Sequence, residues 1–192
     1  MLAPFLEILG LRLQPEQLAL LERHYRALMM WNQRLNLTSV REPEAVVRRH
    51  FAESLFVAAH LGVDEGTLAD VGSGGGFPGL PIAVVRPGVQ VTLVESVAKK
   101  AAFLKEASRG LPNVRVVRVR FEEIEETFDW VVLRGVASDP LAPYLRRSAR
   151  RLGLLMGSKE AEDAVRQLGI RTPQVVALPW EQSRVLVTGS SV

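Results

Sequence analysis

The chain has 192 residues, of which 47% are hydrophobic, and this length and composition suit one domain with a sizeable core. There is no cysteine, which excludes a disulfide framework and a thiolate metal site, and we expect no metal. The formal net charge is +3 and the sequence pI is about 9.7. No apolar run approaches the roughly 20 residues that a membrane span needs, so we expect a cytoplasmic protein that has no signal peptide and does not contact a membrane.

The first 65 residues carry helical patterns. Apolar positions recur at helical spacing from Pro15 to Asn36, and Pro15 suits the first turn of that helix. A second helix is expected from Pro43 to about Leu61. We therefore predict a helical N-terminal extension at residues 1–65, packed on a main domain at residues 66–192.

After Gly66, β-type segments alternate with helical ones. Strands are predicted at 67–72, 89–95, 114–120, 128–135, 152–158, 174–180 and 183–189, and helices at 98–110, 139–153 and 160–169. This alternation predicts an α/β fold with a mostly parallel sheet and helices on both faces. The last two strands leave no room for a crossover helix, so they must form an antiparallel hairpin. The expected architecture is a seven-stranded sheet with one reversed strand near the C-terminus.

A glycine-rich loop, DVGSGGGFPGLP, occupies residues 70–81 between the first predicted strand and a helix. Glycine allows positive φ and a close approach of the backbone to a ligand. Pro78 and Pro81 fit the first turn of the helix that follows. An ordinary tight turn does not need this many glycines, so the loop predicts a small-molecule cradle at the carboxyl end of a strand.

The glycine loop has two possible registers. GGGFPG at 74–79 matches the G-x-G-x-x-G dinucleotide fingerprint, whereas DVGSGGG at 70–76 reads D-x-G-x-G-x-G, which resembles the first motif of class I S-adenosylmethionine methyltransferases. Glu95, at the end of the second strand, does not discriminate, because either cofactor class would place ribose hydroxyls there. An NAD-type oxidoreductase therefore stays open as an alternative on this motif alone.

Three features favour the methyltransferase register. Asp70 stands two residues before the first glycine, a Phe121-Glu122-Glu123 loop follows the third strand, where such enzymes hold adenine, and the C-terminal hairpin matches the reversed strand of that fold. S-adenosylmethionine is a sulfonium cation without phosphates, so a site with several carboxylates suits it better than it suits a pyrophosphate.

Arginines gather in two groups, one at 109–120 and one at 134–151. Because the guanidinium fork suits phosphate, these groups indicate a polyanionic partner such as nucleic acid. A merely solvated surface remains the alternative for the cluster at 146–151.

Further motifs resemble one family, the bacterial GidB-type (RsmG) methyltransferases, which methylate N7 of a guanine in 16S ribosomal RNA of the small subunit. The matching residues are Trp31-Asn32, Asn36-Leu37-Thr38, His50-Phe51-Ala52-Glu53-Ser54-Leu55, the loop from Val71 to Pro81, Lys99-Lys100, Phe103-Leu104 and Arg120-Phe121-Glu122-Glu123. The resemblance implies a class I (Rossmann-like) fold, S-adenosyl-L-methionine as cofactor and small-subunit ribosomal RNA as partner. We expect a monomer.

The resemblance also implies roles for individual residues. Cofactor contacts are expected at Gly72, Gly74, Gly76, Phe77, Glu95, Phe121, Glu122, Glu123 and Arg134, and RNA contacts at Arg120, Arg146, Arg147 and Lys159. Guanine N7 carries a free lone pair and no proton, so no general base is needed and catalysis should be mainly positioning. Arg134 is the candidate that orients the base through guanine O6, and His50 is expected to be structural or phosphate-facing.

The chain departs from the family pattern in three places. Leu133-Arg134-Gly135 replaces Ser-Arg-Ala, Gly157-Ser158-Lys159-Glu160 replaces a Lys-Gly ending, and Glu53 replaces an aspartate. A small-molecule methyltransferase, or a non-catalytic RNA-binding protein on the same fold, therefore remains an alternative.

Overall fold

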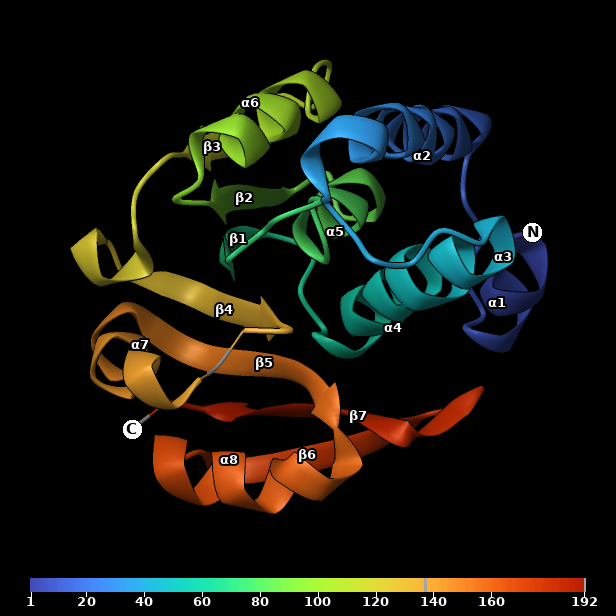
Figure 1. Cartoon of the computed structure of the whole chain (residues 1–192). Helices are drawn as coiled ribbons and strands as arrows, with labels where there is room; N and C mark the ends of the chain where they lie inside the picture. The colour runs from blue at the N-terminus through green and yellow to red at the C-terminus, as the bar shows by residue number, and fades with distance from the viewer. Residues whose placement is uncertain (137, 192) are drawn as a thin grey trace.

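The computed structural model of the protein describes residues 1–136 and 138–191. Its centre is a seven-stranded sheet with the strand order β3-β2-β1-β4-β5-β7-β6 (Figure 1). The strands are β1 (Gly66–Val71), β2 (Val89–Val94), β3 (Val114–Val117), β4 (Phe128–Arg134), β5 (Ala149–Gly157), β6 (Arg171–Leu178) and β7 (Glu181–Ser190). Only β7 runs antiparallel to its neighbours, β5 and β6, so the predicted α/β architecture is confirmed for the described residues.

Helices precede the sheet and connect its strands. They are α1 (Ala3–Ile8), α2 (Pro15–Leu35), α3 (Pro43–Val46), α4 (Glu53–His60), α5 (Gly79–Val85), α6 (Ala98–Ala107), α7 (Ala142–Ser148) and α8 (Ala161–Leu168). A π-helical segment, Val47–Ala52, joins α3 to α4. The helix expected from Pro43 to about Leu61 is therefore present, with a wider turn in its middle.

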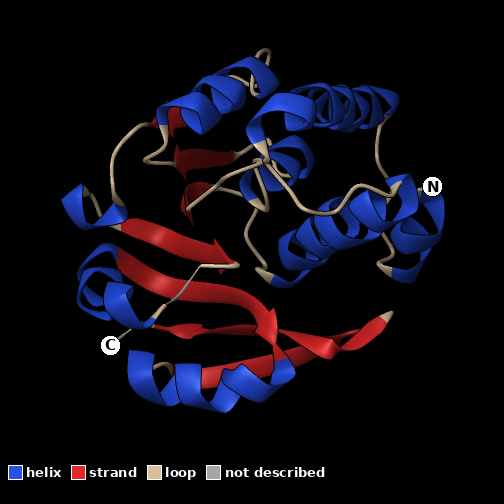
Figure 2. Ribbon diagram, in the orientation of Figure 1, coloured by secondary structure: helices blue, strands red, loops and turns tan. Residues whose placement is uncertain are grey.

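Alternating strand residues divide the core into two layers, as the two-residue repeat of a strand requires. In β1, Leu68 belongs to one buried cluster, while Ala69 and Val71 belong to the other. The Leu68 layer also contains side chains of α2, α4, α5 and α6, and the Ala69 layer contains those of α7 and α8. Helices thus cover both faces of the sheet (Figure 2).

The N-terminal helices share the core of the sheet domain. Leu21 and Leu28 of α2 and Phe51 of the π-helical segment lie in the same buried cluster as Phe103 of α6. Trp31 of α2 packs its ring edge against Phe103 at a centroid distance of 5.9 Å. This packing holds α2 and the π-helical segment beside the glycine loop.

Two predicted boundaries are wrong in the arginine-rich regions. The helix predicted at 139–153 ends at Ser148, and β5 begins at Ala149, which pairs with Phe128 of β4. Since Leu152 and Leu154 are buried within the sheet, burial outweighs the helical propensity of the preceding arginines. The strand predicted at 114–120 ends at Val117, because the chain then turns into a short 3₁₀ segment, Phe121–Glu123.

Within residues 1–136 and 138–191, no helix is both long enough and apolar enough to cross a membrane.

Candidate functional site

The glycine loop leaves β1 and turns over the end of β2. Gly72, Gly74 and Gly76 have φ values of +70°, +51° and +87°, a conformation that side-chain-bearing residues rarely adopt. The amides of Gly72 and Ser73 both donate to the carbonyl oxygen of Val94, at 2.9 and 3.1 Å. The loop is therefore fixed to the neighbouring strand; Gly72 is exposed and Gly74 is half-buried, whereas Gly76 is buried.

Asp70, near the end of β1, holds the glycine loop through hydrogen bonds. Its side chain is fully buried, and Oδ2 accepts the amide of Gly79 at 3.0 Å, while the hydroxyl of Ser73 donates to the Asp70 carbonyl at 2.8 Å. Burial raises the pKa of this carboxyl to about 7. Oδ1 has no hydrogen-bond partner among the described residues. A Cβ at Gly79 would lie 2.7 Å from Oδ2, so glycine permits this close approach.

Glu95 lies beside the loop, just after β2. Its Oε2 accepts the amide of Gly74 at 3.0 Å, and its Oε1 accepts the amide of Val97 at 2.8 Å. A Cβ added at Gly74 would meet only the carbonyl oxygen of Gly72, at 3.7 Å, so the space above this glycine is open. The structure therefore brings together two predicted residues, Gly74 and Glu95, around an open surface with a fixed carboxylate. A carboxylate beside this surface suits a ligand that combines hydroxyl groups with a positive charge.

The turn after β3 is fastened from α7. Phe121 is buried, and the guanidinium of Arg147 donates to the carbonyl oxygens of Glu122 (3.3 Å) and Ile124 (2.8 Å). Glu123 accepts the amide of Arg120 through its side chain at 2.9 Å. Arg147, which was predicted to contact RNA, thus stabilises the turn that carries the predicted adenine contacts.

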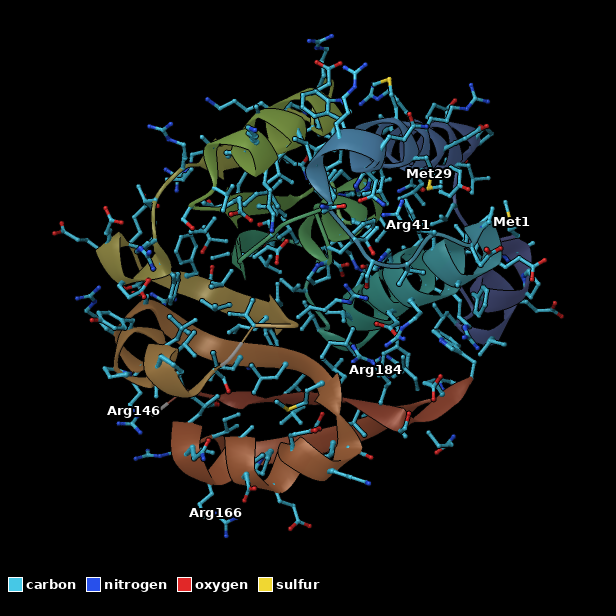
Figure 3. The ribbon with its side chains drawn as sticks, in the orientation of Figure 1. Met1, Met29, Arg41, Arg146, Arg166 and Arg184 are labelled. Carbon is cyan, nitrogen blue, oxygen red and sulfur yellow. The ribbon has the colours of Figure 1, made fainter. Side chains whose placement is uncertain are left out.

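The other predicted RNA contacts lie on the surface. Arg146 donates from α7 to the carbonyl oxygen of Gln167 at 3.0 Å, and its label in Figure 3 lies at the periphery of the molecule. Arg120 and Lys159 are exposed. The structure does not bring these residues together with Arg134.

Phe77 lies between two histidines from the N-terminal helices. Its ring stacks on His24 at 4.7 Å and on His50 at 4.9 Å between centroids. His24 bonds the carbonyl oxygen of Gly75 at 2.7 Å, and His50 bonds the hydroxyl of Thr38 at 2.7 Å. Burial lowers the pKa of His24 to about 4 and that of His50 to about 3, so both rings are neutral at pH 7. Phe77 is 6% exposed and supports the loop from beneath.

Arg134, at the end of β4, belongs to a buried ionic cluster. Its Nε donates to Oε2 of Glu53 at 3.2 Å, and Arg184 of β7 donates to the same oxygen at 3.2 Å. Arg134 also contacts Nδ1 of His50 at 3.0 Å and donates to the carbonyl oxygen of Arg49. The label of Arg184 in Figure 3 lies between α4 and the carboxyl end of β5. Glu53 is 1% exposed, and its carboxylate thus joins the N-terminal helices to two strands that are distant in the sequence.

Sequence reasoning missed Arg184, His24 and the ionic role of Glu53. Arg184 stands 131 residues from Glu53, and no local pattern pairs them. The only available signal was the spacing of His50 and Glu53, which places both on one face of a helix.

Two adjoining cavities open at the carboxyl ends of β4 and β5. The first, which we call the arginine cavity, has a volume of about 240 Å³ and is lined by Thr38, Arg49, His50, Arg134, Gly135 and Arg184, among others. The second, which we call the β4–β5 cavity, has a volume of about 310 Å³ and is lined by Gly135, Val136, Met156, Gly157, Glu160 and Arg184, among others. They adjoin because Gly135 and Arg184 line both.

Val136 connects the β4–β5 cavity with the glycine loop. It lines this cavity, and its Cγ2 lies only 2.7 Å from the position that a Cβ at Gly72 would take. A larger cavity of about 870 Å³ is lined by residues that precede β1, among them Met1, Phe5 and Arg48. We place the functional site at the two smaller cavities, because ligands of open α/β sheets bind at the carboxyl ends of strands beside a change in strand order. Here that change lies between β1 and β4.

Comparison with known sequences gives a consistent family. The model of the GidB family, described as rRNA small subunit methyltransferase G, matches residues 17–171. The ribosomal RNA small subunit methyltransferase G of Roseiflexus sp. (strain RS-1) is 37% identical over 203 residues, covering 95% of this chain and 87% of the relative. The protein of the same name from Nitrosomonas europaea is 48% identical over 120 residues, covering 60% of this chain and 55% of the relative.

Solved structures share the fold at low sequence identity. A SAM dependent methyltransferase from Aquifex aeolicus aligns with a TM-score of 0.66 and 19% identity, covering 82% of this chain and 97% of that chain. TYW2 of M. jannaschii, solved in complex with AdoMet, aligns with a TM-score of 0.61 and 14% identity, covering 82% of this chain and 81% of that chain. At these sequence identities, the similarities support the fold alone.

Proposed function

The chain belongs to the rRNA small subunit methyltransferase G family, and we propose that it methylates N7 of a guanine in small-subunit ribosomal RNA with S-adenosylmethionine. The observation that carries this proposal is the family match, which runs from residue 17 to residue 171. That range includes the glycine loop, Glu95, the Phe121–Glu123 turn and Arg134.

The glycine loop and the neighbouring turn are the proposed cofactor site. Gly72 and Gly74 present backbone, whereas Gly76 is buried against Leu80 and His24. Glu95 offers carboxylate oxygens to ribose hydroxyls, and the turn at Phe121–Glu123 borders adenine. The open space above Gly74 and the carboxylate of Glu95 beside it fit a cationic ligand. When bound, S-adenosylmethionine supplies an electrophilic methyl group.

The residues of the chain then need only to bind and orient the acceptor. Guanine N7 carries a free lone pair and no proton, so no side chain has to remove a proton. Orientation of N7 and exclusion of water are the expected contributions to the rate. Methylation leaves a positive charge on the base, which a nearby carboxylate such as that of Glu160 would stabilise.

Arg134 is the proposed positioning residue for the substrate nucleotide. It lines the arginine cavity and is held there by Glu53 and His50. The residues that line the β4–β5 cavity do not include it. We therefore assign Arg134 to the placement of the nucleotide.

We also propose the domain division and the setting of this activity. Residues 1–65 would be an extension that depends on the sheet domain at 66–192, because both contribute side chains to one buried cluster. The protein would act as a monomer in the cytoplasm, where small-subunit RNA is assembled.

The test is methyl transfer from labelled S-adenosylmethionine to small-subunit RNA, both protein-free and assembled, followed by nucleoside analysis. Label in N7-methylguanosine is the expected result. Cofactor binding without transfer to either RNA would overturn the ribosomal substrate and favour a small-molecule acceptor or a non-catalytic role. A thermal shift with NADH but not with S-adenosylmethionine would overturn the cofactor.

A further inference from the structure

The two cavities at the ends of β4 and β5 differ in charge. The arginine cavity is lined by Arg49, Arg134 and Arg184, against which the buried carboxylate of Glu53 supplies one negative charge. His50 adds no charge at pH 7, because burial lowers its pKa to about 3. The β4–β5 cavity is lined mainly by aliphatic side chains and Met156, and the charge of Glu160 offsets that of Arg184, which lines both cavities. These linings suit a ligand with an anionic part in the arginine cavity and a largely apolar part, with hydrogen-bond donors for Glu160, in the β4–β5 cavity.

A guanosine nucleotide extruded from RNA has this composition. We propose that the arginine cavity binds a phosphate of the target nucleotide and that the β4–β5 cavity holds its guanine, with Glu160 bound to the N1–H and the 2-amino group. This inference rests on the proposed function and adds a two-part nucleotide site to it. Bases that undergo chemistry leave the stack and enter pockets of this kind.

The phosphate half is supported by unused donors on the arginines. Arg184 uses one nitrogen for Glu53, while its buried Nε has no hydrogen-bond partner among the described residues. Arg49 is exposed and lines the same cavity. Arginine contacts to phosphate fix the register of a nucleic acid without reading its sequence. A phosphate between Arg49 and Arg184 would balance the excess positive charge of the cavity.

The guanine half follows from the strand order β1-β4-β5, which puts Val136, just after β4, nearer to the glycine loop than Glu160, which follows β5. Val136 borders the glycine loop at Gly72, while Glu160 stands after β5, with its carboxylate against Gly157: a Cβ there would lie 2.1 Å from Oε2. In guanine, N7 and the edge that carries N1–H and the 2-amino group lie on opposite sides of the ring. A base whose donor edge meets Glu160 would therefore turn N7 toward the glycine loop, where the methyl donor is proposed to bind.

Replacement of one guanosine by inosine tests the guanine half, because inosine lacks the 2-amino group and keeps N7. Wild-type protein should methylate RNA with inosine at the modified position about 10-fold less efficiently, measured as kcat/KM. In Glu160→Ala the guanosine-to-inosine ratio should approach one, and Glu160→Gln should restore part of it. The control is Glu162→Gln, an exposed acidic neighbour on α8. An unchanged ratio in Glu160→Ala would overturn this half.

The salt dependence of RNA binding tests the phosphate half. Arg49→Gln should weaken RNA binding about 5- to 20-fold at 0.1 M salt and lower the slope of log affinity against log salt by about one. The control is Arg166→Gln, an exposed arginine on α8 whose label in Figure 3 lies far from that of Arg184. Cofactor affinity should stay unchanged in Arg49→Gln. Equal salt slopes for Arg49→Gln and wild type would overturn this half.

Failure of the inference and failure of the proposed function are distinguishable. If wild-type protein forms no N7-methylguanosine, the proposed function is wrong. If wild-type protein forms it, but neither the inosine ratio nor the salt slope responds to the substitutions, the function stands and the two-part site is wrong.

Discussion

The carboxylate of Glu53 is the junction of the N-terminal helices, β4 and β7, and its replacement by glutamine should destabilise the protein strongly. Oε2 accepts from both Arg134 and Arg184 at 3.2 Å, and the three side chains are 2%, 15% and 19% exposed. Removal of one partner of a buried ion pair costs about 3–5 kcal/mol, because the remaining charge stays desolvated. Glutamine keeps the volume and one acceptor oxygen, so we expect about 3 kcal/mol for Glu53→Gln.

The assay is urea unfolding at pH 7, with the free energy of unfolding extrapolated to water. Glu44→Gln is the control, since Glu44 is exposed on α3 and should change stability by less than about 0.5 kcal/mol. Glu53→Asp keeps the charge but shortens the side chain by one methylene, so its cost should fall between those of the control and Glu53→Gln. A cost below about 1 kcal/mol for Glu53→Gln would refute the reasoning, because it would show that the two arginines do not depend on this carboxylate.

Three further predictions concern the glycine loop. Gly79→Ala should cost about 1–3 kcal/mol in urea unfolding, because its Cβ would lie 2.7 Å from the buried carboxylate of Asp70, and a cost near zero would contradict this packing. Between about pH 4.5 and 6, the free energy of unfolding should rise with pH. On unfolding, His24 and His50 take up two protons, because their folded pKa values are about 4 and 3, and Asp70 releases one proton, because its folded pKa is about 7. Asp70→Asn removes the opposing contribution and should steepen that rise from about one proton to about two, measured by urea unfolding across this range; equal slopes would exclude the raised pKa. Glu95→Gln should weaken S-adenosylmethionine binding about 10-fold in calorimetric titration, since an amide cannot accept from both backbone N–H groups, and unchanged affinity would remove Glu95 from the cofactor site.

The fold was predictable because its strands obey local rules. β2 and β4 are short apolar runs bounded by turn residues, and the two residues between β6 and β7 permit only a hairpin. The predicted boundary between helix and strand was wrong where charged residues precede buried ones. Ala149 to Arg151 look helical in sequence, yet they begin β5 because the leucines that follow fill the sheet.

Sequence reasoning also indicated residues that the fold brings to one edge of the sheet. The glycine loop and Glu95 each stand where a strand ends, and parallel strands bring their carboxyl ends to one edge of the sheet. Phe77 was expected to contact the cofactor and Arg147 the RNA, but in the structure both side chains have partners within the protein. Phe77 packs between two histidines, and Arg147 bonds backbone carbonyls, since long-range packing decides which atoms of a motif reach the surface.

The ionic cluster beside the proposed substrate site could not be predicted, because its charges are paired across most of the chain. Arg184 is one arginine among many in the sequence, and only the fold places it beside Glu53 and Arg134. The glutamate that replaces the family's aspartate is long enough to accept from both arginines through one oxygen, which leaves Nε of Arg184 unpaired next to the arginine cavity. Since glutamate and aspartate carry the same charge, this departure from the family pattern changes the reach of the carboxylate and not the charge of the cavity. The same carboxylate stabilises the fold and limits how strongly the arginines can attract a phosphate, so substitutions at Glu53 should change stability and RNA affinity in opposite directions.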